Sequence, residues 1–384
     1  MIISVGGFSH QLPACENEVQ AFPAVFDSYD LHSIKDCERK RRSTQNPIEL
    51  SKVLGDTPLP VDMNMFWGSS KNKLKLEILL HEVIAVSLRS AQQVVAGEIK
   101  HGKPCKSTIN EVVLEMPELH SHMQEADERI PLHIANSLKY NINCIVVHSP
   151  DTDVILLLLY HFSILQANGL QQLWVRCGVG DSTRFVPIHT MAAQHGSLCS
   201  VLPAVHHLTG SDYTSKVGTK SAALKANPEH FLSEFGHYIH EPKLSDSLSK
   251  AEAYLVQVLK KGTTAQTINE LRTHLYFHSK ASHELPPTSE AIKAHILRAC
   301  IATREMLCVF QTADDKPDPT SFGYVLDGEL LVPVVGHNPL PEEYTVQCGC
   351  KKCVRASCSC KRKSVLCTKF CECTLQEESI CGNT

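Results

Sequence analysis

The sequence lacks the features of membrane-spanning, secreted and disordered proteins. Its longest apolar run, DVILLLLYHF at residues 153–162, is about half as long as a transmembrane helix needs to be. The opening stretch MIISVGGFSHQLPAC has no basic segment ahead of an apolar one, so we expect no signal peptide. Hydrophobic residues make up 43% of the chain and charged residues 20%, as in globular proteins. We therefore expect an intracellular protein without a membrane partner.

A large excess of charge is also missing. The net charge of −4 gives no overall attraction to nucleic acid, so any such contact must come from a local patch. Cysteine, by contrast, is abundant, and nine of the 17 cysteines fall between residues 348 and 381. In an intracellular chain we expect all 17 cysteines to be thiols and metal ligands rather than disulfides.

The cysteine-rich tail has the spacing C-x-C-x2-C-x4-C-x-C-x6-C-x3-C-x-C-x7-C. A structural zinc ion takes four ligands, so nine cysteines complete three sites only when three of them bridge two ions. The spacing thus predicts a three-zinc cluster, and the alternatives are a disulfide-bonded knot and a disordered basic tail. The expected zinc ligands are Cys348, Cys350, Cys353, Cys358, Cys360, Cys367, Cys371, Cys373 and Cys381.

Basic residues separate these cysteines, with no acidic residue between Cys348 and Cys371. A basic module held by metal suits a nucleic-acid phosphate backbone. The segment resembles the tesmin/TSO1-like CXC domain, which implies zinc-dependent DNA binding, although Cys353 comes earlier here than in that pattern. The residues expected to contact nucleic acid are Lys351, Lys352, Arg355, Lys361, Arg362 and Lys363.

The rest of the chain alternates strand-like and helix-like stretches between about residues 20 and 225. AFPAVFD (21–27) and NCIVVHS (143–149) are typical of buried strands, and residues 73–99 and the stretches after Glu125 and Asp153 are typical of helices. This alternation predicts an α/β fold, a parallel sheet flanked by helices. We expect a helical region at 226–310, a linker at 311–347 with a hairpin in YVLDGELLVPVV, and the zinc module at 348–384.

Acidic residues follow both predicted strands. Asp27 ends the first, and Asp151 and Asp153 come just after the second, at the sheet edge where α/β proteins bind ligands. Asp151 has an alternative role as a helix cap. Glu125 and Asp127 begin another predicted helix, where Glu125 has the alternative of a surface ion pair with Arg129.

In order and context, these acids resemble those of the flap-endonuclease/XPG branch of PIN-like nucleases. EADERI, SPDTDV and LTGSDYTSKVGTKSAAL are similar to its motifs. The resemblance implies a PIN-like domain at 20–225 with a Mg²⁺ or Mn²⁺ site, since six neighbouring carboxylates repel strongly without cations. It also implies that Gly218 and Lys220 hold duplex phosphates. The implied catalytic residues are Asp27, Glu125, Asp127, Asp151, Asp153 and Asp212.

One family residue has no counterpart here: the strand-like start MIISVGG is not followed by an Asp. The hypotheses are therefore a metal-dependent nuclease that binds DNA through its tail and, alternatively, a DNA- or chromatin-binding protein whose active site has decayed. The whole arrangement also resembles a group of animal proteins related to mobile elements. ERKRR (38–42) is typical of a nuclear import segment, so we expect a nuclear location.

Histidine is frequent, with 21 residues, and His206 and His207 stand beside LTGSDY. Adjacent side chains point in different directions, so a shared metal ion is not expected. We expect these two histidines to have packing and solvent roles.

Overall fold

The computed structural model describes most of the chain between residues 48 and 334 and the cysteine-rich tail. The described residues are 2–4, 21–27, 34, 37, 48–58, 60–87, 93–96, 106–109, 112–278, 285–311, 317–328, 330–334, 348–353, 356–367, 371–374 and 381–383. The chain divides into two compact units, Met1–Val334 and Val335–Thr384. Each is described by itself.

The first unit contains a mixed eight-stranded sheet in the order β5-β4-β3-β2-β1-β6-β7-β8. Pairs β2/β3 and β6/β7 are parallel, and the other neighbours are antiparallel. The α/β prediction is confirmed, but the sheet is parallel only in part. The strands are β1 Ile2–Ser4, β2 Ala21–Ala24, β3 Gln93–Ala96, β4 Lys106–Ile109, β5 Val112–Glu115, β6 Cys144–His148, β7 Gln172–Cys177 and β8 Arg184–Pro187.

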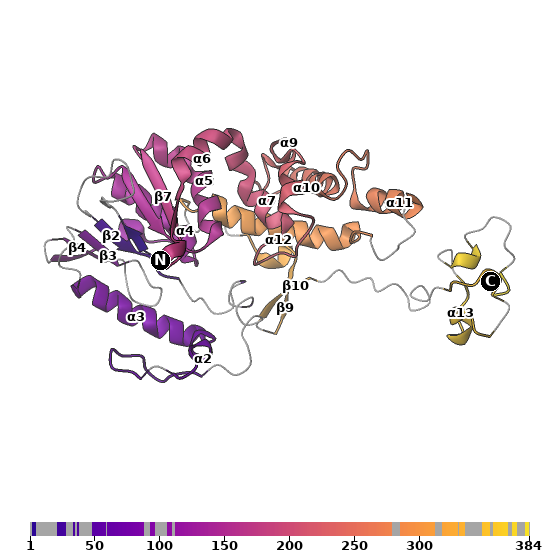
Figure 1. The fold of residues 1–384 in the computed structure, drawn as a ribbon, viewed down its shortest axis with the longest axis horizontal. Helices are drawn as coiled ribbons and strands as arrows, with labels where there is room; N and C mark the ends of the chain where they lie inside the picture. The colour runs from indigo at the N-terminus through magenta and orange to yellow at the C-terminus, as the bar shows by residue number, and fades with distance from the viewer. Residues whose placement is uncertain are drawn as a thin grey trace. The chain divides into compact units, whose positions relative to one another are not determined.

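Helices cover both faces of this sheet (Figure 1). Ala24 and Phe26 pack with Leu74 and Ile78 on one face, and Val25 shares a cluster with buried residues of the helices on the other face. The alternation of neighbouring residues between faces is that of an extended strand. The helices of this part are α2 Met63–Trp67 and α3 Ser70–Ser87 on the first face, and α4 Ala126–Leu138, α5 Thr152–Ala167 and α6 Ile188–His195 on the second.

The helix expected at 73–99 ends early, and this is a correction. Helix α3 stops at Ser87, and Gln93–Ala96 forms strand β3 beside β2. The two adjacent valines of QVVA favour an extended backbone, and pairing with β2 satisfies their backbone groups. Another expectation also fails: Cys144, at the start of β6, is disulfide-bonded rather than a free thiol.

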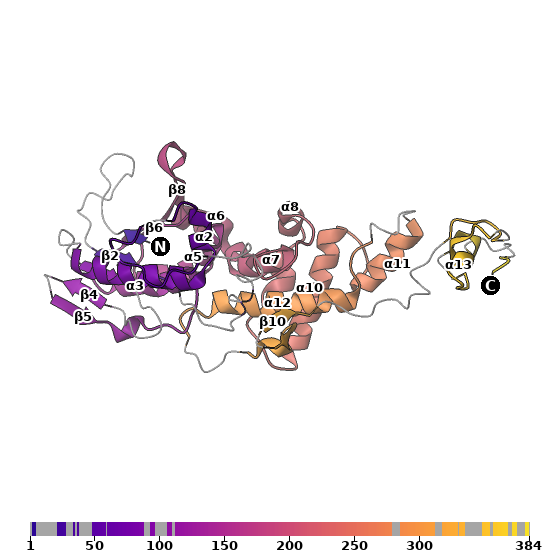
Figure 2. The ribbon, with the colours of Figure 1, turned by 90° about the horizontal axis from the view of Figure 1, so that it is seen from below.

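The remainder of the first unit is mainly helical, as predicted (Figure 2). Residues on both sides of the expected boundary at 225/226 share one buried cluster, and the Tyr254 hydroxyl donates to the carbonyl of Ala223 at 3.1 Å. The two predicted domains thus form one packed unit. Its helices are α7 Leu202–Thr209, α8 Lys220–Leu224, α9 Pro228–Leu232, α10 Lys243–Leu259, α11 Ile268–His278 and α12 Ser289–Leu307.

Part of the expected linker is also packed into this unit. The predicted hairpin is present as β9 Tyr324–Asp327 and β10 Leu330–Pro333. Tyr324 is 2% exposed in the helical cluster, and Arg298 of α12 donates to the carbonyls of Gly323 and Val334, each at 3.1 Å. These buried bonds fasten the hairpin to α12.

Candidate metal and nucleic-acid sites

Strand directions bring two of the predicted acids to the same edge of the sheet. Strand β1 is antiparallel to both neighbours, and Ile2 pairs with Ala24 of β2 and with His148 of β6. Strands β2 and β6 therefore run the same way, and their carboxyl ends flank the beginning of β1. With strands about 4.8 Å apart, these two ends are about 10 Å apart at the backbone. Asp27 and Asp151 each lie three residues further along the chain.

The direction of β1 bears on the family Asp that is missing from this sequence. Because β1 runs against β2 and β6, its carboxyl end at Ser4 lies at the opposite edge of the sheet from the carboxyl ends of β2 and β6. An acid placed after this strand would begin at the wrong edge to join Asp27 and Asp151.

Asp27 is connected directly to the beginning of α4. Its Oδ1 accepts a hydrogen bond from the backbone N–H of Ala126 at 2.8 Å. Glu125 is the N-cap residue but makes no capping bond with its own side chain, so Asp27 supplies a cap from a distant part of the chain. A carboxylate is stabilised at the positive end of a helix. This bond brings Glu125 and Asp127 beside Asp27.

Arg129 also holds the beginning of α4 against the end of β2. Its side chain donates to the carbonyl of Met123 at 3.0 and 2.8 Å and to that of Phe26 at 3.3 Å. Arg129 is only 2% exposed, so it does not lie on the surface as the alternative of a Glu125–Arg129 surface pair assumed. The buried guanidinium ties α4 to the residue that precedes Asp27.

Asp151 and Asp153 lie at the beginning of α5. Oδ1 of Asp151 accepts from the N–H of Asp153 at 3.0 Å, so the capping alternative for Asp151 is confirmed. Asp151 is exposed, and the Asp153 side chain is 28% exposed. Oδ1 of Asp153 lies 3.4 Å from Nε2 of His206, in the last turn of α7.

The turn that carries Asp212 follows α7 and approaches α4. Asp212 is exposed, and its neighbour Tyr213 packs against the helical cluster. Burial raises the pKa of Tyr213 well above its ordinary value, and the carboxylates of Glu125, Glu305 and Glu128 raise it further. The Asp212 turn and the beginning of α4 therefore share one electrostatic environment.

Gly218 and Lys220, expected to hold phosphates, have structural roles in this turn. Gly218 has φ +67°, and a Cβ there would lie 2.6 Å from Cγ1 of Val258 on α10. Nζ of Lys220 donates to the carbonyls of His206 and Gly210, each at 3.0 Å, and so caps the end of α7. Burial lowers the pKa of Lys220, against the opposing effect of Asp153.

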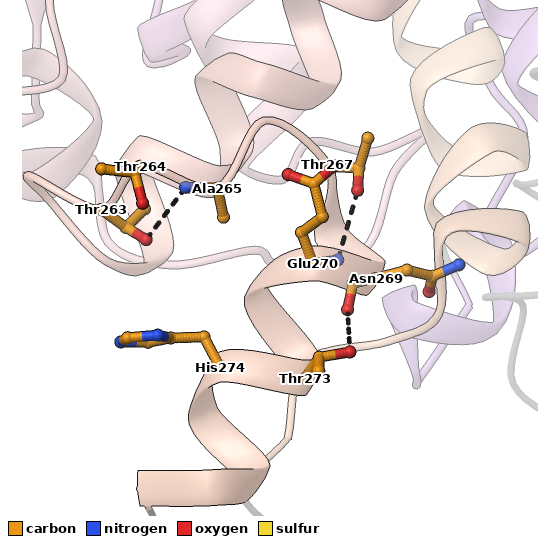
Figure 3. A pocket seen from close by; sticks show the side chains of 8 residues that line it. All are labelled: Thr263, Thr264, Ala265, Thr267, Asn269, Glu270, Thr273 and His274. Carbon is orange, nitrogen blue, oxygen red and sulfur yellow. Dashed lines mark hydrogen bonds between the residues drawn. The ribbon is translucent and has the colours of Figure 1, made fainter.

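Pockets lie among the described residues of the helical part of the first unit. One, of about 320 Å³, is lined by residues of the Asp212 turn, among them Ser211, Lys216 and Lys220. Another, of about 600 Å³, lies beside the beginning of α11, with His274 and several threonines around it (Figure 3). The second pocket contains none of the predicted site residues.

The segments that carry the predicted carboxylates lie near one another, but their carboxylate oxygens are not close enough together to bind one ion. Among the described residues, the groups of three or more His, Cys, Asp or Glu ligand atoms within 4.8 Å of one another consist of cysteines alone. A divalent ion at the Asp27 edge would therefore need side-chain rotation or ligands from water and substrate.

The cysteine-rich tail does contain ligand groups. All nine of its cysteines are free thiols, which excludes the disulfide-bonded knot, and the cluster is compatible with zinc. Eight of the nine form three overlapping sets of four: Cys348–Cys350–Cys353–Cys358, Cys348–Cys353–Cys367–Cys373 and Cys348–Cys360–Cys367–Cys371.

Three cysteines recur in these sets and lie at the centre. The sulfurs of Cys348, Cys353 and Cys367 form a triangle with sides of 3.3, 3.7 and 3.6 Å. Around a tetrahedral zinc with Zn–S bonds of about 2.3 Å, neighbouring sulfurs lie about 3.8 Å apart. Cys381, outside the three sets, is hydrogen-bonded to Cys373, Cys367 and Cys353. The tail thus gathers all nine predicted ligands.

These thiols need a cation to lose their protons together. Burial, with hydrogen bonds from neighbouring thiols, raises the pKa of Cys353 and of Cys360 far above the ordinary value. The backbone N–H of Lys361 acts the other way on Cys358 and lowers its pKa to about 6. Because the thiolate is the form that binds metal, zinc would reverse the raised values.

Basic side chains surround the cluster. Lys351, Lys352, Arg362 and Lys363 are exposed, and Lys361 is half-buried on the short helix α13 Ser359–Arg362. Arg355 lies outside the described residues, as does the segment ERKRR. The described cations are therefore accessible to a polyanion.

Comparison with known proteins identifies no relative: no family model, curated protein or solved structure matches the chain. In the described part of the chain, no helix is both long and apolar enough to cross a membrane.

His206 is the site residue that the sequence did not predict. Packing and solvent roles were expected for both adjacent histidines. His207 is buried and accepts or shares a hydrogen bond with the Ser211 hydroxyl at 2.9 Å, whereas His206 faces Asp153. Only the packing of α7 against α5 brings these two residues together, and no local pattern indicates it.

Proposed function

We propose that this protein is a DNA-binding, metal-dependent nuclease of the PIN-like class, with DNA held by a zinc-stabilised CXC-type tail. The observation that carries the nuclease part is the hydrogen bond from the N–H of Ala126 to Asp27, which joins acids of two separate segments at one sheet edge. Asp153, in the first turn of α5 after β6, adds a third segment, and His206 adds a fourth.

The residues at this edge have distinct roles in the proposal. Asp27, Glu125 and Asp127 hold one side of the ion site, and Asp151, Asp153 and Asp212 hold the other. Divalent Mg²⁺ or Mn²⁺ would supply the Lewis acidity that in-line hydrolysis of a phosphodiester requires. Arg129 and Asp27 keep the beginning of α4 fixed against the end of β2, so that these carboxylates are positioned before the substrate arrives.

In the tail we assign three zinc ions to the nine cysteines. The central sulfurs of Cys348, Cys353 and Cys367 each bridge two ions, since they recur in the ligand sets. This completes twelve ligand positions. The sites are Cys348–Cys350–Cys353–Cys358, Cys353–Cys367–Cys373–Cys381 and Cys348–Cys360–Cys367–Cys371.

A cleavage assay tests the nuclease part. Purified, zinc-loaded protein is incubated with flap and duplex DNA in Mn²⁺, beside an Asp151→Ala/Asp153→Ala variant and an Asp181→Ala control. Asp181 is exposed in the turn after β7, so its loss removes one charge away from the predicted acids. We expect cleavage by the wild type and the control but not by the double variant. Absence of cleavage by the wild type contradicts the nuclease proposal.

A second candidate function is DNA or chromatin binding without catalysis. It is favoured by the distances at the Asp27 edge, where the described carboxylates form no ligand group, and by the engagement of Lys220 with two carbonyls. Zinc-dependent retention of DNA without cleavage is the outcome that supports it.

DNA binding by the tail is tested through its salt dependence. Replacing Lys351, Lys352, Arg362 and Lys363 by alanine should reduce the slope of log K against log salt by about 0.9 for each lost phosphate contact. Fluorescence anisotropy with duplex DNA measures it, and an unchanged slope argues against this surface. A nuclear location follows from the same proposal and is tested by imaging a tagged chain.

A further inference from the structure

The contact between His206 and Asp153 is not an ordinary hydrogen bond. Nε2 of His206 lies 3.4 Å from Oδ1 of Asp153, beyond the usual range for N–H···O bonds of about 2.7–3.2 Å. Nε2 is a buried atom, and it has no hydrogen-bond partner in the described part of the chain. An imidazole nitrogen buried without a partner is destabilising, so its position calls for an explanation.

The imidazole is fixed where it stands. Its side chain is 13% exposed, and its ring packs edge-on against His207 with centroids 5.0 Å apart. The backbone carbonyl of His206 accepts from Lys220, which anchors the last turn of α7. On the other side, Asp153 is fixed in the first turn of α5, where its N–H donates to Asp151.

The separation of the two atoms suits a shared metal ion. Two ligands with metal bonds of about 2.1 Å lie about 3.0 Å apart at a right angle and about 3.4 Å apart at the tetrahedral angle. The 3.4 Å between Nε2 and Oδ1 falls in this range. A second histidine or acid within ligand distance is not found among the described residues, so the other positions would be taken by water and by phosphate oxygens.

We propose that His206 joins Asp153 as a ligand of one divalent ion, and that the imidazole makes this site select Mn²⁺ over Mg²⁺. This rests on the proposed nuclease function, to which it adds the metal preference and a nitrogen ligand. Imidazole suits first-row transition metals, whereas Mg²⁺ prefers oxygen ligands. The ion would have open positions for a phosphodiester.

Lys220 opposes the ion and limits its affinity. Burial lowers the pKa of Lys220 and Asp153 partly offsets this effect, so the ammonium lies within electrostatic reach of the Asp153 carboxylate. Without metal, this cation offsets the charge of Asp153. With metal, it weakens binding, which keeps the site exchangeable rather than permanently loaded.

Pulsed electron paramagnetic resonance of Mn²⁺ bound to the zinc-loaded full chain tests the site. We expect a ¹⁴N coupling from imidazole in the wild type and in a His195→Ala control, in which an exposed histidine of α6 is removed. His206→Ala should lose the coupling and weaken Mn²⁺ binding by at least about 10-fold, since loss of a residue that only supports a ligand already costs that much. His206→Asp should lose the coupling but gain Mg²⁺ affinity, because it replaces nitrogen by oxygen.

The outcomes separate this inference from the nuclease proposal. A ¹⁴N coupling that disappears in His206→Ala supports the site even when no DNA is cleaved. Bound Mn²⁺ without the coupling, or Mn²⁺ affinity unchanged in both His206→Ala and Asp153→Asn, overturns it and leaves an ordinary ion pair. Circular dichroism of each variant checks that the fold is retained.

Discussion

The carboxylate of Asp27 caps helix α4 from across the chain, accepting the N–H of Ala126 at 2.8 Å, 99 residues away in sequence. A capping bond usually comes from the residue just before the helix. Here the N-cap position is occupied by Glu125, which makes no capping bond of its own. The end of β2 thus becomes part of the start of helix α4.

Replacing Asp27 should therefore destabilise the first unit. Asp27→Ala removes the cap and leaves the half-buried N–H of Ala126 without its acceptor, which we expect to cost about 1–2 kcal/mol of unfolding free energy. Asp27→Asn keeps an acceptor oxygen and should cost less. Urea unfolding monitored by circular dichroism measures both, and equal losses for the two variants would show that the bond itself contributes little.

Gly218 should tolerate alanine much less well than Gly262. Both have positive φ, +67° and +78°, but a Cβ at Gly262 meets nothing within 4 Å, whereas one at Gly218 meets Val258 at 2.6 Å. We expect Gly262→Ala to cost about 1 kcal/mol from backbone strain and Gly218→Ala about 1–3 kcal/mol more from overpacking. Thermal unfolding measures the difference.

The double variant Gly218→Ala/Val258→Ala identifies the clash. Removing Cγ1 of Val258 makes room for the new methyl group, so the two substitutions together should cost less than the sum of their separate costs. Additive costs would mean that Gly218 is needed for its backbone conformation alone.

Acid should destabilise the first unit through buried His133. Burial, with a smaller contribution from Arg129, lowers the pKa of His133 from 6.5 to about 3. The unfolded chain therefore binds the proton more readily than the folded one, and stability that is complete above pH 6.5 is lost as the pH falls toward 3. The slope for this residue is at most about 1.4 kcal/mol per pH unit.

His133→Leu should make stability less dependent on pH. Urea unfolding at pH 7 and pH 5 gives the comparison, in which the variant should lose less stability than the wild type. His161, whose pKa burial lowers to about 4, keeps part of the slope in both proteins. A variant as sensitive to pH as the wild type would indicate that His133 does not remain neutral in the folded state.

Replacing a bridging cysteine should remove more zinc from the protein than replacing a cysteine that binds one ion. Cys350 belongs to one ligand set and Cys348 to all three. Cys350→Ser should therefore disturb one ion, and Cys348→Ser at least two. Zinc content measured by mass spectrometry of the native protein distinguishes them, beside an expected three ions in the wild type. Equal zinc contents in the two variants would contradict the bridged assignment.

Local sequence pattern was enough to find the elements that carry the acids. The apolar runs AFPAVFD and NCIVVHS gave β2 and β6, and the residues after Glu125 and Asp153 gave α4 and α5. Each is set by residues close together in the chain. The spacing of the tail cysteines likewise indicated one cluster, because a metal-sized group leaves few other arrangements.

Pairings between distant residues could not be predicted in this way. The direction of β1 depends on β2 and β6 together, and the strand at Gln93–Ala96 forms only because β2 offers it an edge. Tyr324 was assigned to a linker because Pro, Asp and Gly surround it, yet its ring is buried against the helices. The approach of His206 to Asp153 depends on helix packing in the same manner.

Strand β1 has a consequence for how the chain folds during synthesis. It joins the two halves of the sheet, since Ile2 pairs with both Ala24 and His148. Strand β1 is synthesised before either of its neighbours. It can pair with β2 early, but its second edge stays unpaired until β6 has left the ribosome. Closure of so long a loop is slow, so we expect the joining of the two halves of the sheet to be a late step in folding.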